Sequence, residues 1–146
     1  MSKRIFTKQI GGLKIVTGPT EVEDNAITSW LAQDDIEVLG ATGYCLSTVP
    51  SENDGWAFIE VELSQTGELF KDGSIMTVCA QEGWNTTPAG VTQCNGHQAI
   101  AFPTGSAIPI KEEGHLYINM RSENKTAGMS TFRWGFTVYY TKKGYR

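Results

Sequence analysis

Residues 131–141 of this 146-residue chain are TFRWGFTVYYT, and their alternating pattern decides the fold class. Successive side chains of an extended strand point to opposite faces, so every second residue shares a face. One face of this stretch carries only large apolar groups, and the pattern therefore predicts a half-buried strand. Phe132, Trp134, Phe136, Val138 and Tyr140 are expected to point inward, and Arg133, Gly135, Thr137 and Tyr139 outward. Gly135 leaves a gap in the outer face in which another group can lie closely.

Two further stretches repeat the design, WAFIEVELS at 56–64 and HLYINMRS at 115–122. Three alternating strands with one apolar face each predict an antiparallel sheet. The residues expected to point inward are Ala57, Ile59, Val61, Leu63, Leu116, Ile118 and Met120, and those expected to point outward are Phe58, Glu60, Glu62, Ser64, His115, Tyr117, Asn119 and Arg121.

Weaker strand signals complete the predicted fold. They are RIFTKQI at 4–10, LKIVT at 13–17, DIEVLGATGYCLS at 35–47, SIMTVCAQ at 74–81 and QAIAF at 98–102, with turn chemistry at 51–55, 71–73 and 94–96. A short helix is predicted over 22–35, where Ile27, Trp30 and Leu31 share a helical face. We expect an all-β protein, an antiparallel two-sheet β-sandwich of about eight strands, jelly-roll-like, with at most one short helix. A single domain over 1–146 suits this length.

The charge is segregated along the chain, although its total is only −4. Residues 1–14 carry four bases and no acid, whereas residues 17–110 carry thirteen acids and one base, Lys71. The basic terminal segments 1–8 and 142–146 are therefore expected to dock on an acidic partner, such as the middle of a neighbouring copy. A pI near 5.1 argues against nucleic acid as the partner. The candidate assembly residues are Lys3, Arg4, Phe6, Lys142, Lys143, Tyr145 and Arg146.

Residues that could support catalysis are scarce. Cys45, Cys79 and Cys94 are widely spaced, which favours buried reduced thiols over a disulfide framework. The spacing Cys94-x-x-His97 provides too few ligands for a structural zinc site. Glu60 and Glu62 share a face, as a glycosidase pair would, but outward positions on a strand explain them equally well. We expect no enzyme, no metal and no cofactor.

No apolar run has the length of a signal peptide or of a membrane-spanning segment. We therefore expect synthesis in the cytoplasm and no membrane partner.

Binding of a carbohydrate, or of a receptor, is the alternative function. Trp84 and Asn85 lie in a long stretch, 81–109, that is rich in Gly, Pro and Thr, and Trp56 opens a predicted strand. Long loops of this kind are often binding surfaces. Aromatic rings at such places can stack on sugar rings, or they can pack beneath their own loops. A glycan therefore remains a possible ligand.

Residues 108–143, IPIKEEGHLYINMRSENKTAGMSTFRWGFTVYYTKK, resemble the closing strands of small β-sandwich or jelly-roll virion proteins. These are the head-decoration, cement and minor capsid components of viruses and phages. The resemblance is one of style and covers the last quarter of the chain, so it transfers no site residue. It implies a structural protein of the virion, made in the host cytoplasm, whose partners are copies of itself or a major capsid or other virion protein.

Overall fold

The fold was examined in a computed structural model, which describes residues 4–47, 56–83, 97–103 and 105–143. These residues form one antiparallel seven-stranded sheet and contain no helix. Its order is β4-β3-β7-β2-β5, with β1 pairing on β7 and β6 on β2. The strands are β1 (Phe6–Leu31), β2 (Ile36–Ser47), β3 (Trp56–Ser64), β4 (Ser74–Gly83), β5 (His97–Ala101), β6 (Ile108–Ile110) and β7 (His115–Lys142).

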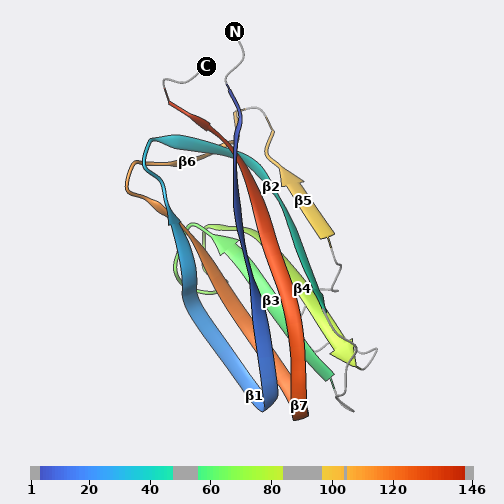
Figure 1. Cartoon of the computed structure of the whole chain (residues 1–146). Coiled ribbons are helices and arrows are strands. Elements are labelled where there is room, and N and C mark those ends of the chain that lie inside the picture. Colours follow the sequence, from blue (N-terminus) through green and yellow to red (C-terminus); the bar gives the residue numbers. More distant parts are fainter. Residues whose placement is uncertain (1–3, 48–55, 84–96, 104, 144–146) are drawn as a thin grey trace.

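β1 and β7 form a long two-stranded ribbon that is folded over at its middle (Figure 1). Pairing runs from Phe6 opposite Tyr140 to Leu31 opposite His115, with a register shift between Gly18 and Thr20. Bulges of this kind bend a strand and increase its twist. Figure 1 shows both strands turning back at the same end of the molecule, away from the two chain ends.

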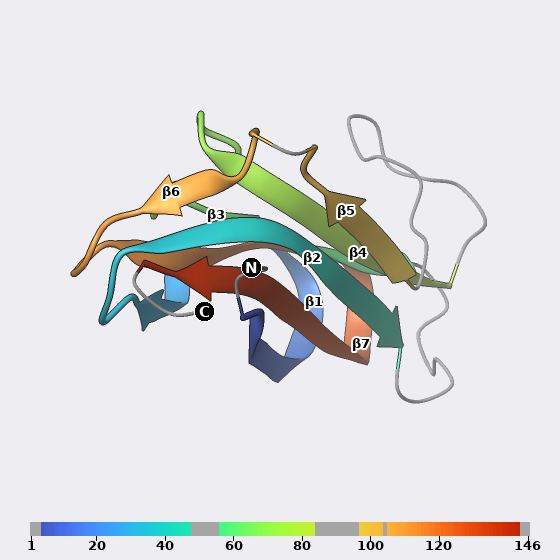
Figure 2. The same ribbon diagram turned by 90° about the horizontal axis from the view of Figure 1, so that it is seen from above.

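The fold-over divides the sheet into two layers. The first half of β7 pairs with β3, which pairs with β4, and the second half of β7 pairs with β2, which pairs with β5 and β6. The first half of β1 pairs with the second half of β7, and the second half of β1 pairs with the first half of β7. Each layer therefore ends in one half of β1. β5 contacts β4, so the folded sheet is nearly closed (Figure 2). The predicted all-β, antiparallel fold class is confirmed, and the folded sheet is consistent with a β-sandwich.

The core lies between these layers and includes every residue that the alternation placed inward. Each well-buried apolar side chain contributes roughly 1.5–3 kcal/mol to folding. The buried set includes Ala57, Ile59, Val61, Leu63, Leu116, Ile118, Met120, Phe132, Trp134, Phe136, Val138 and Tyr140. Cys45 and Cys79 are buried and take part in no disulfide, as predicted, whereas Cys94 lies outside the described residues.

The helix predicted over 22–35 is wrong, because β1 continues as a strand to Leu31. Local spacing favoured a helix, but β7 offers a long partner edge whose hydrogen bonds extend through this segment. Trp30 then points toward the core and packs on Tyr140, with 4.9 Å between ring centroids, while Ile27 remains exposed. Two pairs of predicted strands join, 4–10 with 13–17 in β1 and 115–122 with 131–141 in β7, which reduces the eight predicted strands to six. The short strand β6, which was not predicted, brings the number among the described residues to seven.

The outward positions predicted for β3 and the start of β7 are also wrong in part. Glu60, Glu62 and Asn119 are buried. The segment 65–73 folds back over this face, where the Asn119 side-chain amide donates to the Thr66 carbonyl at 3.1 Å. Gly73, with φ of 103°, makes the predicted turn at 71–73. Phe58 and Ser64 on the same face are buried too, whereas the predicted turns at 51–55 and 94–96 lie outside the described residues.

Candidate functional site

The side of the sandwich that β1 forms is the main candidate interaction surface. In the described part of the chain, β1 pairs only with β7, so its two halves are the edges of both layers. An edge strand presents unpaired backbone N–H and C=O groups to which another chain can add. Large apolar side chains are exposed along the same strand: Leu13 (56%), Ile15 (51%), Ile27 (41%) and Leu31 (43%). We call this surface the β1 edge.

A groove runs between the two halves of β1. Its volume is about 640 Å³, and it is lined by Lys8–Gly11 on one edge and Ile27–Leu31 on the other, together with Gln33 and Trp134. Toward the fold-over, the Lys14 ammonium and the Asp24 carboxylate connect the two edges at 3.7 Å. The groove is therefore part of the β1 edge and lies between the two layers.

An aromatic and basic cluster lies where β1 begins and β7 ends. The rings of Phe6 and Tyr140 stack with centroids 5.7 Å apart. The Arg4 guanidinium lies 5.2 Å and the Lys142 ammonium 4.6 Å from the centroid of the Phe6 ring. These are cation–π distances. Lys142 also lies 3.7 Å from a carboxylate oxygen of Asp34, so a C-terminal base contacts an acid of its own chain.

Asp35, beside Asp34, holds the neighbouring turn. Its carboxylate accepts a hydrogen bond from the backbone N–H of Glu112 at 2.9 Å, and its carbonyl accepts one from the backbone N–H of Lys143. The hydrogen bond from Glu112 lowers the pKa of Asp35, and the charges of Lys111 and Lys143 act in the same direction.

The structure brings three of the predicted assembly residues together, namely Arg4, Phe6 and Lys142. Lys143 follows Lys142 and is exposed. Lys3, Tyr145 and Arg146 lie outside the described residues, as do Trp84 and Asn85 of the carbohydrate alternative. Trp56 begins β3, but its side chain is also outside the described set.

Sequence reasoning missed the apolar part of the β1 edge. Ile27 and Leu31 were assigned to a helical face, so their exposure on a strand was not foreseen. Trp134 was correctly predicted to be buried, but not to line a groove. The available signal was the apolar Val22 between the acids Glu21 and Glu23, an alternation typical of a strand, and in the structure exposed and half-buried residues alternate there.

A buried polar cluster connects β3, β7 and the segment 65–73. Both carboxylate oxygens of Glu62 accept from the backbone N–H of Phe70 at 3.2 Å, and Oε1 also accepts from the Asn119 amide at 2.9 Å. Glu60 accepts from the Arg121 guanidinium through Nε, at 2.9 Å, and through Nη2. Both carboxylates are thus engaged in holding the loop and the sheet together, which is a structural role.

Two observations concern metal binding and membrane-spanning helices. Among the described residues, no three His, Cys, Asp or Glu side chains are grouped so that they could hold a metal ion. The same part of the chain has no helix with the length and hydropathy needed to cross a bilayer.

Comparisons with known proteins identify no family. No family model matches the chain, and no curated protein matches it. Solved structures with a related arrangement include a pilus protein of Bacillus endospore appendages, at 13% identity and a TM-score of 0.40, covering 98% of this chain and 93% of that one. The BFDV capsid protein, solved as a 60-mer, matches at 12% identity and a TM-score of 0.43, covering 97% of this chain and 95% of that one.

A chain of infectious bursal disease virus, Gx strain, matches at 12% identity and a TM-score of 0.39, covering 98% of this chain but 33% of that one. At such identities and scores, these likenesses concern the β arrangement and assign no function.

Proposed function

We propose that this protein is a non-enzymatic structural protein that assembles with neighbouring subunits through the β1 edge. More specifically, we propose a virion component of the decoration, cement or minor capsid type, which docks on copies of itself or on a major capsid protein. One observation carries the proposal: both layers of the sandwich end in the same strand, β1, and that strand exposes large apolar side chains.

Monomeric β proteins usually protect their edge strands with charges, prolines or bulges. β1 has some of these features, including Lys8, Pro19 and the register shift after Gly18. It nevertheless exposes Leu13 and Ile27. Burial of each such side chain against a neighbour would contribute up to roughly 1.5–3 kcal/mol. Strand addition would pair the edge backbone at the same time.

The charges of β1 favour a particular mode of contact. Its first half and the residues before it carry the exposed bases Arg4 and Lys8, and its second half carries the exposed acids Glu21 and Glu23. Contact of the first half of one copy with the second half of the next brings opposite charges together and steers docking. Such a head-to-tail contact produces a ring or an open chain of subunits.

Size-exclusion chromatography with light scattering tests this proposal on the full chain. The double variant Leu13→Lys/Ile27→Lys places charges on both edges and should convert assemblies into monomers. Leu46→Lys is the matched control, because Leu46 on β2 and Leu13 on β1 lie opposite the same residue, Arg133, and both are exposed. Circular dichroism checks that both variants are folded. A wild-type chain that stays monomeric at high concentration, or a control that dissociates equally, would overturn the proposal.

A further inference from the structure

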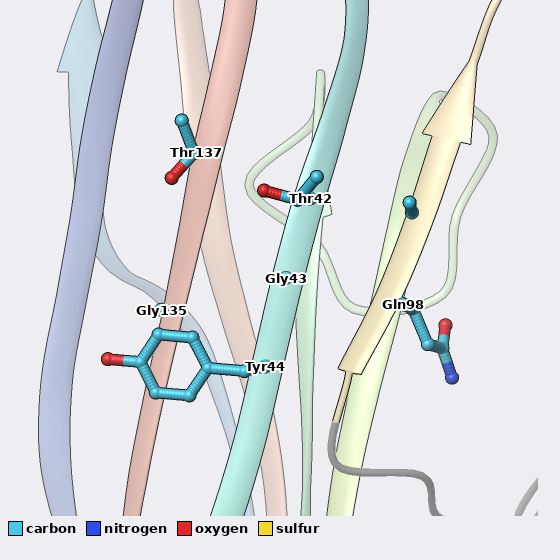
Figure 3. A pocket seen from close by; sticks show the side chains of 7 residues that line it. Thr42, Gly43, Tyr44, Gln98, Gly135 and Thr137 are labelled. Atoms are coloured by element: carbon cyan, nitrogen blue, oxygen red, sulfur yellow. The ribbon is translucent and has the colours of Figure 1, made fainter.

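The outer face of the layer that contains β2 carries a second hollow, separate from the groove of the β1 edge. Its volume is about 340 Å³, and it lies over β2, β5 and the second half of β7 (Figure 3). This volume is at the lower end of the range for ligand sites, roughly 300–1,000 Å³. The described residues that line it are polar or small and carry no formal charge.

The Tyr44 ring forms one part of this hollow. Register places Tyr44 opposite Gly135, and a Cβ atom at Gly135 would lie only 2.7 Å from Cε1 and 2.9 Å from Cζ of the ring. The ring therefore packs directly against the backbone of β7, in the gap that the sequence predicted. Figure 3 shows the ring broadside above β7, with one face against the strand and the other turned toward the viewer.

Polar side chains lie beside the ring in the neighbouring row of the sheet. Thr42 is opposite Thr137, which is opposite Gln9 of β1, so three polar residues cross three strands. Thr42 is exposed and Thr137 is half-buried. Figure 3 places both threonine side chains on the viewer's side of the sheet. Gln98 of β5 is opposite Gly43, which is opposite the core residue Phe136, so its side chain belongs to the other face.

We propose that this hollow binds a neutral hexopyranose ring. The C–H face of such a sugar is apolar and stacks on an aromatic ring, whereas its hydroxyl groups require donors and acceptors at the edge. Tyr44 supplies the ring, and Thr42 and Thr137 supply the hydroxyl partners. The absence of formal charge among the described lining residues favours a neutral sugar over an acidic one. The sequence based its carbohydrate alternative on Trp84, Asn85 and Trp56, whose side chains lie outside the described part of the structure.

A purely structural role for Tyr44, as an aromatic cover over a glycine, makes different predictions. Such a role explains a loss of stability in Tyr44→Ala, but it does not explain any change in sugar binding when the threonine hydroxyls are removed. The double variant Thr42→Val/Thr137→Val removes those hydroxyls while it keeps β-branched side chains of similar shape. It is therefore expected to fold as the wild type does.

The probe is an immobilised panel of neutral tetrasaccharides of glucose, mannose, galactose and N-acetylglucosamine, with binding measured on the full chain. We expect the wild type to bind at least one of them, Tyr44→Ala to lose binding, and Thr42→Val/Thr137→Val to weaken it about tenfold. Tyr139→Ala is the control, because Tyr139 is exposed on the same face of β7 but does not line the hollow, and it should bind as the wild type does. The proposal would be overturned if the wild type bound none of the tetrasaccharides, or if Tyr44→Ala bound them as the wild type does.

Discussion

Replacement of Arg121 by methionine tests the buried polar cluster most directly. The Arg121 guanidinium donates to Glu60 and lies over two aromatic rings, 5.4 Å from the centroid of Phe58 and 5.8 Å from that of Phe70. The Glu60 side chain is only 6% exposed. The substitution keeps most of the aliphatic volume but leaves the Glu60 carboxylate in the sheet without its counter-charge.

The expected loss of stability follows from that burial. Removal of one partner from a buried ion pair costs roughly 3–5 kcal/mol, because the remaining charge is desolvated and unpaired. The Arg121 side chain is 20% exposed, so water can reach part of the vacated space, and we expect the lower end, about 3 kcal/mol. Domains of this kind have total stabilities of about 5–15 kcal/mol, so the effect is large.

Urea unfolding followed by tryptophan fluorescence measures the change. The double variant Glu60→Leu/Arg121→Met should recover most of the loss, because the unpaired carboxylate of residue 60 is then removed as well. Lys111→Met is the control, since the Lys111 side chain is 84% exposed and lies 4.0 Å from Asp35, and such surface pairs contribute about 0–1 kcal/mol. A loss in Arg121→Met no larger than in the control would refute the assignment of a buried ion pair.

Two further predictions concern Cys45 and Gly135. Burial is the main cause, and the neighbouring Cys79 the second, that raises the pKa of Cys45 from 9.0 to about 12. Mass spectrometry should therefore find Cys45 unmodified by iodoacetamide at pH 8 until the chain unfolds. Because the folded state retains this proton more strongly, the thiol's contribution to stability is complete below pH 9 and decreases as the pH rises toward 12. Gly135→Ala should destabilise by about 1–3 kcal/mol in urea unfolding, because the new methyl group overlaps the Tyr44 ring. Gly135→Ala combined with Tyr44→Ala should lose less than the sum of the two single losses.

Strand alternation predicted the core correctly because it depends on local geometry. Phe132, Trp134 and Phe136 share one face of any extended chain, whatever their partner strands are. Alternation does not reveal what covers the opposite face. Glu60 and Glu62 have the pattern of outward residues, yet a loop that folds back over them makes them buried.

Long-range pairing explains why the candidate site was only partly predicted. The bases Arg4 and Lys142 were identified from the charge distribution, and their contacts with Phe6 follow from the pairing of β1 with β7. The segment around Ile27 has helical spacing, and only its partner on β7 makes it a strand. Tyr44 was not identified, although Gly135 on the opposite strand had been recognised as a gap, because strand order decides which residues face each other.

The fold-over of the β1–β7 ribbon separates the two proposed sites. It places one edge of each layer on β1, so a neighbouring subunit can add to either layer from the same side of the molecule. Tyr44 lies on β2, which β7 separates from that edge. Assembly through β1 therefore leaves the hollow at Tyr44 uncovered, and a subunit in a shell could still bind a sugar. It follows that Leu13→Lys/Ile27→Lys should abolish assembly and keep sugar binding, whereas Thr42→Val/Thr137→Val should keep assembly and weaken sugar binding. If either double variant lost both assembly and sugar binding, the two surfaces would not be independent.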